Sequence, residues 1–233
     1  MSPDPFGTVA LEYLPFLLQG AWTTLTIVLA AIVCATVLGF VLAYMRRSHS
    51  RALRGIAATY VWIFRGMPLL LTLFFLYYTQ PFGLTLNAFT AGLLAMSLNS
   101  ASFFSEIIRA GLQAVDKGHL EAAESIGMNP VQKFLRVTLP EGVRLMTPPY
   151  INNCVIMLKE SAQVSVITVP DLMLQTQGAY NSTYNVAETL GVAAVLYLAL
   201  TSLLMALQMV LERRTGRKLG KPARTPVLVR SAA

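Results

Sequence analysis

Residues 24–44 read TLTIVLAAIVCATVLGFVLAY, a stretch with no charged side chain and with threonines as its only hydrophilic interruptions. An apolar helix of about 20 residues is long enough to cross the roughly 30 Å hydrocarbon core of a bilayer. The rest of the chain has the same character, because only 12% of its 233 residues are charged, whereas soluble domains carry about 25%. The sequence therefore predicts an all-α, polytopic membrane protein.

Further apolar stretches bring the expected number of transmembrane helices to about five. After the first, they lie at about 57–78, 88–108, 143–158 and 187–211. The second stretch contains the sequence RGMP at 65–68. Gly66 and Pro68 are expected to kink or break this helix, because proline lacks the backbone donor and clashes with the preceding turn.

The distribution of lysine and arginine predicts the orientation, since these residues concentrate in cytoplasmic loops beside the spans. The loop after the first span, an insert at about 116–140 and the C-terminal tail are basic, whereas residues 1–23, 79–87 and 161–186 contain neither Lys nor Arg. Five spans alternate between the two sides in agreement with this pattern. We expect an external N-terminal segment, 1–16, a transmembrane domain, 17–212, and a basic cytoplasmic tail, 213–233.

Composition and motifs argue against several other classes of protein. The net charge is +7, but the basic residues flank apolar spans and form no basic-aromatic face, so no nucleic-acid partner is expected. Cys34 and Cys154 lie in apolar runs without a CxxC motif or a His/Cys cluster, so no metal site is predicted. The chain lacks the HExxH and GxSxG motifs, and no catalytic residues are predicted.

The third span carries a stripe of polar residues on one helix face. The stripe consists of Asn99, Ser102, Glu106, Arg109 and Gln113, at intervals of 3, 4, 3 and 4 residues. This spacing keeps them on one side of a helix over about 21 Å. Ionisable groups inside a span usually face a bundle interior or a wet cavity. The stripe is either a wall of the substrate pathway or a packing surface, with Glu106 and Arg109 as a structural or gating pair near the inner membrane surface.

Polar residues also gather at the end of the fourth span. They are Asn152, Asn153, Lys159, Glu160, Ser161 and Gln163. Asn152, Lys159 and Gln163 lie at offsets of 0, 7 and 11 residues, which predicts that they share one helix face. A zwitterionic solute needs a cation for its carboxylate and an anion or amide for its amine, which Lys159, Glu160 and Gln163 would supply. The alternative is that Lys159 and Glu160 are simply solvated at the outer end of the helix. Arg65 in the second span either contacts a substrate carboxylate or the partner subunit, or caps the broken helix.

The insert at 116–140 is more polar than the apolar spans on either side, with seven charged residues from Asp116 to Glu141. It is predicted to form two short helices. Glu121 is expected near the start of the first helix, where the helix dipole favours an acidic residue. Gly127 suits the left-handed residue that ends a helix, and Asn129 with Pro130 then turns the chain into the second.

The insert carries a resemblance to a known family. EAAESIG at 121–127, followed after nine residues by VTLP at 137–140, resembles the EAA motif of bacterial binding-protein-dependent ABC importer permeases. Four further segments resemble the polar-amino-acid branch of that family: QGAWTTL (19–25), FRGMPLL (64–70), SEIIRAGLQAVDKGHLEAA (105–123) and LKESAQVSVITV (158–169). The resemblance covers about residues 17–212. Residues 160–163, Glu-Ser-Ala-Gln, depart from the usual Asp/Asn-Thr-Ser-Leu of the family.

The resemblance implies a type I ABC importer permease fold and the permease subunit of an ATP-driven importer of polar or charged amino acids, in a bacterial cytoplasmic (inner) membrane. The implied partners are ATP-binding cassette ATPase subunits, an extracytoplasmic solute-binding protein and a second permease subunit, identical or paralogous. The resemblance also implies that six residues couple this chain to the ATPase: Glu121, Ala122, Ala123, Gly127, Leu139 and Pro140. This chain has no GxxxxGK[ST] loop, so ATP and Mg are expected on the partner ATPase, with no cofactor and no enzyme activity in this chain.

Two alternatives stay open at the level of sequence. An ion-gradient-driven secondary transporter often contains inverted internal repeats, and none is visible in this chain. A non-transporting membrane anchor for a cytoplasmic partner has no need of polar stripes inside its spans.

Overall fold

The computed structural model describes residues 8–214, and every regular element among these residues is helical. The α-helices, in chain order, are α1 (Thr8–Arg46), α2 (Arg51–Gly66), α3 (Leu69–Tyr78), α4 (Ala88–Gln113), α5 (Lys117–Ser125), α6 (Pro130–Lys133), α7 (Leu139–Glu160), α8 (Leu172–Thr183) and α9 (Val186–Arg214). Short 3-10 turns cover Pro81–Gly83 and Ser161–Ile167, and a π-turn covers Phe134–Thr138. The all-α expectation is confirmed.

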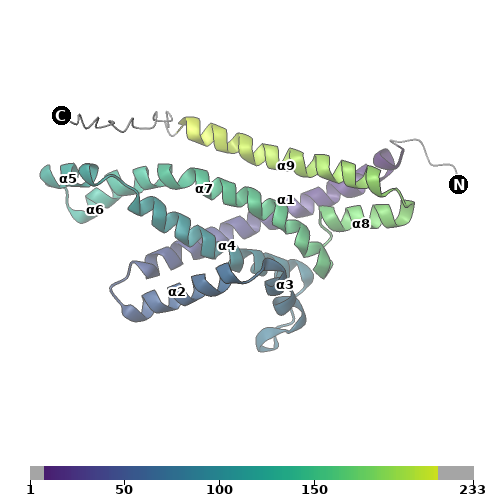
Figure 1. Cartoon of the computed structure of the whole chain (residues 1–233), viewed down its shortest axis with the longest axis horizontal. Helices are drawn as coiled ribbons and strands as arrows, with labels where there is room; N and C mark the ends of the chain where they lie inside the picture. Colours follow the sequence, from purple (N-terminus) through teal and green to yellow (C-terminus); the bar gives the residue numbers. More distant parts are fainter. Residues whose placement is uncertain (1–7, 215–233) are drawn as a thin grey trace, which may run out of the picture.

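Helices α1 and α4 form the centre of the fold, and α4 also packs against α7 (Figure 1). The main apolar cluster joins Ile27 and Ala31 of α1 with Ala95 and Phe104 of α4, all of them almost fully buried. Gly39 permits the close crossing, since a Cβ built there lies 2.9 Å from Phe104 Cβ and 3.2 Å from the Ala101 carbonyl oxygen. In a bilayer, helix association depends on van der Waals packing and hydrogen bonds, and small residues at the crossing let the two backbones approach closely.

The expected break in the second span is present and is larger than a kink. Helix α2 ends at Gly66, Met67 is extended, and α3 begins directly after Pro68 at an angle of 102° to α2. Proline at 68 accounts for the position of the break, because the residue before a proline is disfavoured in helical conformation.

Helices occupy all five stretches where spans are expected, although they are not equally apolar. By length and composition, three helices of the described chain can cross a membrane, α1, α4 and α9, and a fourth if α2 and α3 count as one broken span. Helix α7 is less apolar: it carries charged residues at both ends, Glu141 and Arg144 near its start and Lys159 and Glu160 at its end, and Pro148, Pro149, Asn152 and Asn153 in between. It packs against α4 and α9, within the bundle.

The helix ends separate into two groups (Figure 1). The turn between α1 and α2, the short helices α5 and α6, and the C-terminal end of α9 lie at one end of the molecule, and α8 lies at the other. The basic segments of the described chain therefore gather at one end, which is the pattern that the alternation of the spans predicts.

Candidate transport pathway and coupling site

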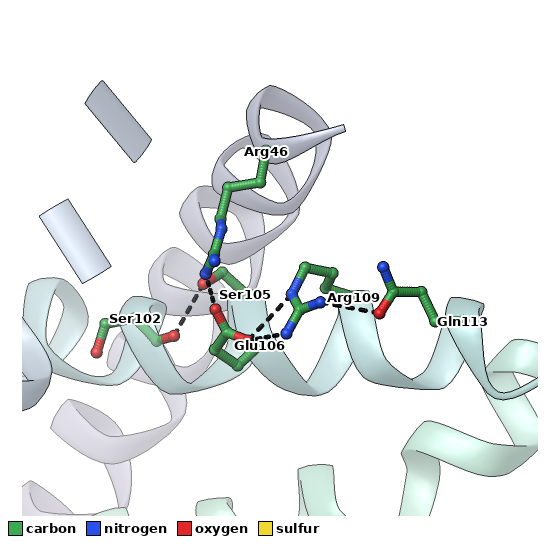
Figure 2. A network of polar contacts seen from close by, with 6 residues as sticks. All are labelled: Arg46, Ser102, Ser105, Glu106, Arg109 and Gln113. Atoms are coloured by element: carbon green, nitrogen blue, oxygen red, sulfur yellow. Dashed lines mark hydrogen bonds and ion pairs between the residues drawn. The ribbon is translucent and has the colours of Figure 1, made fainter. Parts of the chain in front are cut away.

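The polar stripe of α4 contains an ion cluster centred on Glu106 (Figure 2). Arg109, one turn further along α4, donates from Nε at 3.1 Å and from Nη2 at 2.6 Å to Glu106 Oε2, and from Nη1 at 2.8 Å to Gln113 Oε1. Arg46, the last residue of α1, pairs with the other carboxylate oxygen of Glu106. The predicted pairing of Glu106 with Arg109 is thus confirmed, and Arg46 is a second partner that the sequence analysis missed.

Arg65 lies near the same carboxylate and completes a locally positive site. Two cavities of about 570 and about 500 Å³ are each lined by Arg65 and Glu106. The first also reaches Arg46, and the second reaches Pro149 of α7. The Arg65 guanidinium lies 5.4 Å from the centre of the Phe103 ring, a cation–π contact. In the first cavity, Arg46 and Arg65 face a single Glu106, and this excess of positive charge favours an anionic group.

Asn99 and Ser102, the other end of the stripe, make their hydrogen bonds to backbone carbonyls. Asn99 Nδ2 donates to the carbonyl oxygens of Phe64 at 3.0 Å and Met67 at 3.3 Å, the groups left free where α2 breaks. Ser102 is fully buried and donates to the Asn99 carbonyl at 2.6 Å. Asn99 therefore performs the capping that was one of the two readings for Arg65, whose side chain is exposed and points to Phe103 instead.

The polar residues of the fourth span are spread over different environments. Asn152 and Lys159 are exposed, Asn153 is buried, and Glu160 is partly exposed as the last residue of α7. Ser161 is fully buried and donates to the Leu158 carbonyl at 2.7 Å. Gln163 follows in a 3-10 turn. Gln163 does not share the α-helical face of Asn152 and Lys159, so that prediction was wrong, because the helix changes from α to 3-10 after Glu160.

At the other end of α4, the insert folds into the two short helices that were predicted. Helix α5 begins after Asp116, whose Oδ1 accepts from the Gly118 amide at 2.6 Å. Glu121 lies in the middle of α5, so its expected place at the helix start was wrong; Asp116 holds that position. Side chains of Glu121 and Ala122 are exposed and Ala123 is buried.

Gly127 ends α5 in the left-handed conformation, as predicted, with φ +77°. The Met128 amide donates to the Ala123 carbonyl at 3.1 Å and the Gly127 amide to the Glu124 carbonyl at 2.9 Å, the Schellman pattern that closes a helix. A reciprocal capping box then starts α6: Asn129 Oδ1 accepts from the Gln132 backbone N–H at 2.9 Å, and Gln132 Oε1 accepts from the Asn129 backbone N–H at 3.2 Å. Leu139 and Pro140 begin α7.

Two ion pairs hold this pair of short helices, which we call the coupling knob (residues 117–133). Lys133 of α6 pairs with Glu124 of α5, and His119 Nδ1 lies 2.8 Å from Glu141 Oε2 at the start of α7. The hydrogen bond and the charge of Glu141 raise the pKa of His119 above its ordinary value. Two apolar side chains of this segment face outward: Ile126 is 73% and Val131 is 66% exposed.

Sequence reasoning missed three features of these sites. Arg46 was assigned only to a basic loop, and its partner Glu106 lies far along the chain. The target of Asn99 depends on where α2 breaks relative to α4. The pair of His119 with Glu141 joins two helices whose relative placement no local pattern fixes. Among residues 8–214 there is also no group of three or more His, Cys, Asp or Glu suited to a metal ion.

Comparison with known proteins agrees with this architecture. Residues 35–217 match the model of a protein family described as "Binding-protein-dependent transport system inner membrane component". The arginine transport system permease protein ArtQ of Bacillus subtilis is 37% identical over 210 residues, which cover 89% of this chain and 95% of ArtQ.

Solved structures show the same fold. A crystal structure of an amino acid ABC transporter with histidines aligns with a TM-score of 0.82 and 36% identity, over 88% of this chain and 96% of that one. An inward-facing structure of the MetNI methionine ABC transporter aligns with a TM-score of 0.71 at 22% identity, over 88% of this chain and 98% of that one, a likeness of fold alone. With the helical bundle, the broken second span and the coupling knob in place, the chain belongs to the family of binding-protein-dependent transport system inner membrane components.

Proposed function

We propose that this chain is the permease subunit of an ATP-driven importer of polar or charged amino acids. The observation that carries the proposal is the match to ArtQ over 95% of its length, together with a TM-score of 0.82 to an amino acid ABC transporter. The excess of positive charge around Glu106 fits a solute that carries a carboxylate. The two alternatives, a secondary transporter and a membrane anchor, are not favoured by these likenesses.

The proposed complex has two permease subunits, two ATP-binding cassette ATPase subunits and an extracytoplasmic solute-binding protein. ATP and Mg bind to the ATPase subunits, because this chain has no phosphate-binding loop. The basic end of the molecule faces the cytoplasm in a bacterial cytoplasmic membrane, which follows the preference of Lys and Arg for that side. The coupling knob then projects from the cytoplasmic face.

The coupling knob is the proposed docking element for the ATPase subunit. Its exposed apolar side chains, Ile126 after α5 and Val131 in α6, offer contact area, and exposed Glu121 and Ala122 lie on α5. The ion pair between His119 and Glu141 ties α5 to the start of α7, so a displacement of the knob is passed to a helix that lines the pathway. Closure of the ATPase dimer on ATP would thereby shift the population between inward-open and outward-open bundles.

The Glu106 cluster is proposed as the inner end of the substrate pathway. Arg46 and Arg109 both form ion pairs with Glu106, so one carboxylate joins α1 to α4 at the basic end of the bundle. Arg65 lacks an acidic partner among residues 8–214 and faces the two cavities that share Glu106, so it is free to attract the substrate carboxylate. Asn99 holds the broken second span, and with it Arg65, in place.

Reconstitution tests this proposal. The chain is co-expressed with its ATPase and solute-binding protein, purified and placed in proteoliposomes, and ATP hydrolysis and uptake are measured over a panel of amino acids. We expect one amino acid class to stimulate both activities. In Glu106→Gln the ATPase subunit still co-purifies but stimulated uptake falls, because Arg46 and Arg109 lose a charged acceptor worth about 1.5–3 kcal/mol. Uptake that follows an ion gradient and needs no ATPase would refute the proposal.

A further inference from the structure

A third cavity, outside the proposed pathway, lies where α1 leaves the bundle. It has a volume of about 510 Å³, within the range of about 300–1,000 Å³ found for ligand pockets. Its walls come from three parts of the chain: Phe40, Tyr44 and Arg47 from the end of α1 and the turn after it, Leu112 from α4, and Phe134 from the turn that follows the coupling knob. Neither Glu106 nor Arg65 contributes to it.

The polarity of this cavity changes along its length. Phe40, Leu112 and Phe134 supply apolar walls, whereas Arg47, Ser48 and His49 form one end. Phe40 and Arg47 are separated by about 10 Å along the helix direction, at about 1.5 Å per residue. Tyr44 lies between them and is 76% exposed, at the position where tyrosines are enriched in membrane interfaces. The cavity thus fits an amphiphile that enters from the bilayer, with its charged group at the turn.

The charge at the polar end selects an anion. Arg47 is exposed, and no hydrogen bond or ion pair of its side chain is found within residues 8–214. Arg54, by contrast, is used structurally: its Nη1 donates to the carbonyl oxygens of Ser48 at 3.0 Å and His49 at 3.3 Å. The turn that carries Arg47 and His49 is therefore fixed, while the Arg47 guanidinium stays available. Guanidinium groups bind phosphate oxygens in bidentate geometry.

From these observations we infer that the cavity between the end of α1, α4 and Phe134 is a binding site for an anionic phospholipid of the cytoplasmic leaflet. The phosphate lies at Arg47 and His49, and an acyl chain follows Phe40 and Leu112. Clusters of basic residues beside a span are typical of anionic-lipid recognition. A soluble phosphate compound would leave the apolar half of the cavity unused. The inference rests on the proposed function only for the side of the membrane that this end faces.

The site has a structural consequence for coupling. Phe134 begins the π-turn that joins the coupling knob to α7. A bound acyl chain fills the space between this turn and α1, and so supports the knob from the side opposite the ATPase. The rate of substrate-stimulated ATP hydrolysis is therefore expected to rise with the fraction of anionic lipid in the bilayer.

The test measures lipid retention by native mass spectrometry on the purified full complex, after exchange into phosphatidylglycerol or phosphatidylcholine, with stimulated ATPase activity measured on the same samples. Arg47→Ala is expected to retain phosphatidylglycerol roughly fivefold less well, as for the loss of one cation beside the membrane surface, with no change for phosphatidylcholine. Phe134→Ser removes an apolar wall and lowers the retention of both lipids. The matched control is Arg51→Ala, since Arg51 is exposed in the same basic segment but does not line the cavity.

Equal losses in Arg47→Ala and Arg51→Ala would overturn the site, because they would indicate general attraction to the surface. Lipid that binds the isolated permease but is absent from the full complex would overturn it too, since the ATPase subunit would then cover the cavity. Failure of the proposed function has a different signature: lipid retention depends on Arg47, yet no amino acid stimulates ATP hydrolysis.

Discussion

Substitution of Gly127 tests whether the end of α5 has to be closed by a left-handed residue. Its φ is +77°, and a Cβ built there meets no atom within 4 Å. Any penalty in this chain is therefore one of backbone conformation, with no steric clash added. A left-handed residue with a side chain costs roughly 1–2 kcal/mol, and a β-branched one is a more severe outlier.

This penalty acts on a helix that is too short to be stable by itself, since isolated helices under about 12 residues are marginal. A loss of about 1–2 kcal/mol lowers the ratio of ordered to frayed knob by about 5- to 30-fold. When only the ordered knob binds, the apparent affinity for the ATPase falls with its population. We expect ATPase binding to weaken from the unaltered chain through Gly127→Asn and Gly127→Ala to Gly127→Val. Asn tolerates the left-handed region better than Ala does, and a β-branched residue tolerates it least.

The assay is titration of the purified ATPase subunit onto each permease variant in lipid nanodiscs, followed by substrate-stimulated hydrolysis. Gly55→Ala is the control, because a Cβ at Gly55 also meets open space but the residue lies within α2 at an ordinary φ. It should bind the ATPase like the unaltered chain. Unchanged binding in Gly127→Val, or equal losses for Gly127→Asn and Gly127→Ala, would refute the reasoning.

Three further predictions concern single polar residues in different parts of the bundle: Asn99, His119 and Asp171, the N-cap of α8. Asn99→Ala leaves two carbonyls at the break of the second span without a donor and should destabilise the purified chain in thermal unfolding by about 1–3 kcal/mol. Ser97→Ala is the control: it loses only a hydrogen bond to a carbonyl of its own helix and should leave the stability unchanged. Glu141 raises the pKa of His119, so the stabilisation from this pair is fully present below the ordinary histidine pKa, near 6.5, and is lost as pH rises through the raised folded value. Hydrogen exchange in α5 should therefore increase with pH by more than the intrinsic exchange rate does. Glu141→Gln should remove this extra pH dependence. Burial raises the pKa of Asp171 to about 6, so the fold loses stability as pH rises from about 4 to about 6 and stays at the lower value above that range. Asp171→Asn should abolish this pH dependence and raise the melting temperature at pH 7.5, whereas Asp171→Ala also loses the cap on the Leu174 amide and should gain less. A melting curve of Asp171→Asn with the pH dependence of the unaltered chain would contradict the assignment.

Much of the local structure was predictable because it depends on residues close in the chain. The apolar run at 24–44 predicted a span, and it lies within α1. Pro68 fixed the break between α2 and α3, since a proline acts on its own turn. Gly127 and Asn129 fixed the end of one short helix and the start of the next. Glu121 was misplaced within its helix because the helix begins four residues earlier, after Asp116, which is its N-terminal cap.

The partners of the polar residues were decided by the tertiary structure. The stripe on α4 was visible in the spacing of its residues, but spacing defines a face and not what lies opposite it. The close crossing at Gly39 brings the end of α1 to Glu106, and the break in the second span turns two free carbonyls toward Asn99. Both results depend on the rotation and crossing of helices far apart in the chain. The sequence by itself thus determined the all-α membrane class, the break at Pro68 and the pair of short helices at 117–133, because these depend on neighbouring residues, whereas only helix packing decided which charges meet and where the cavities open.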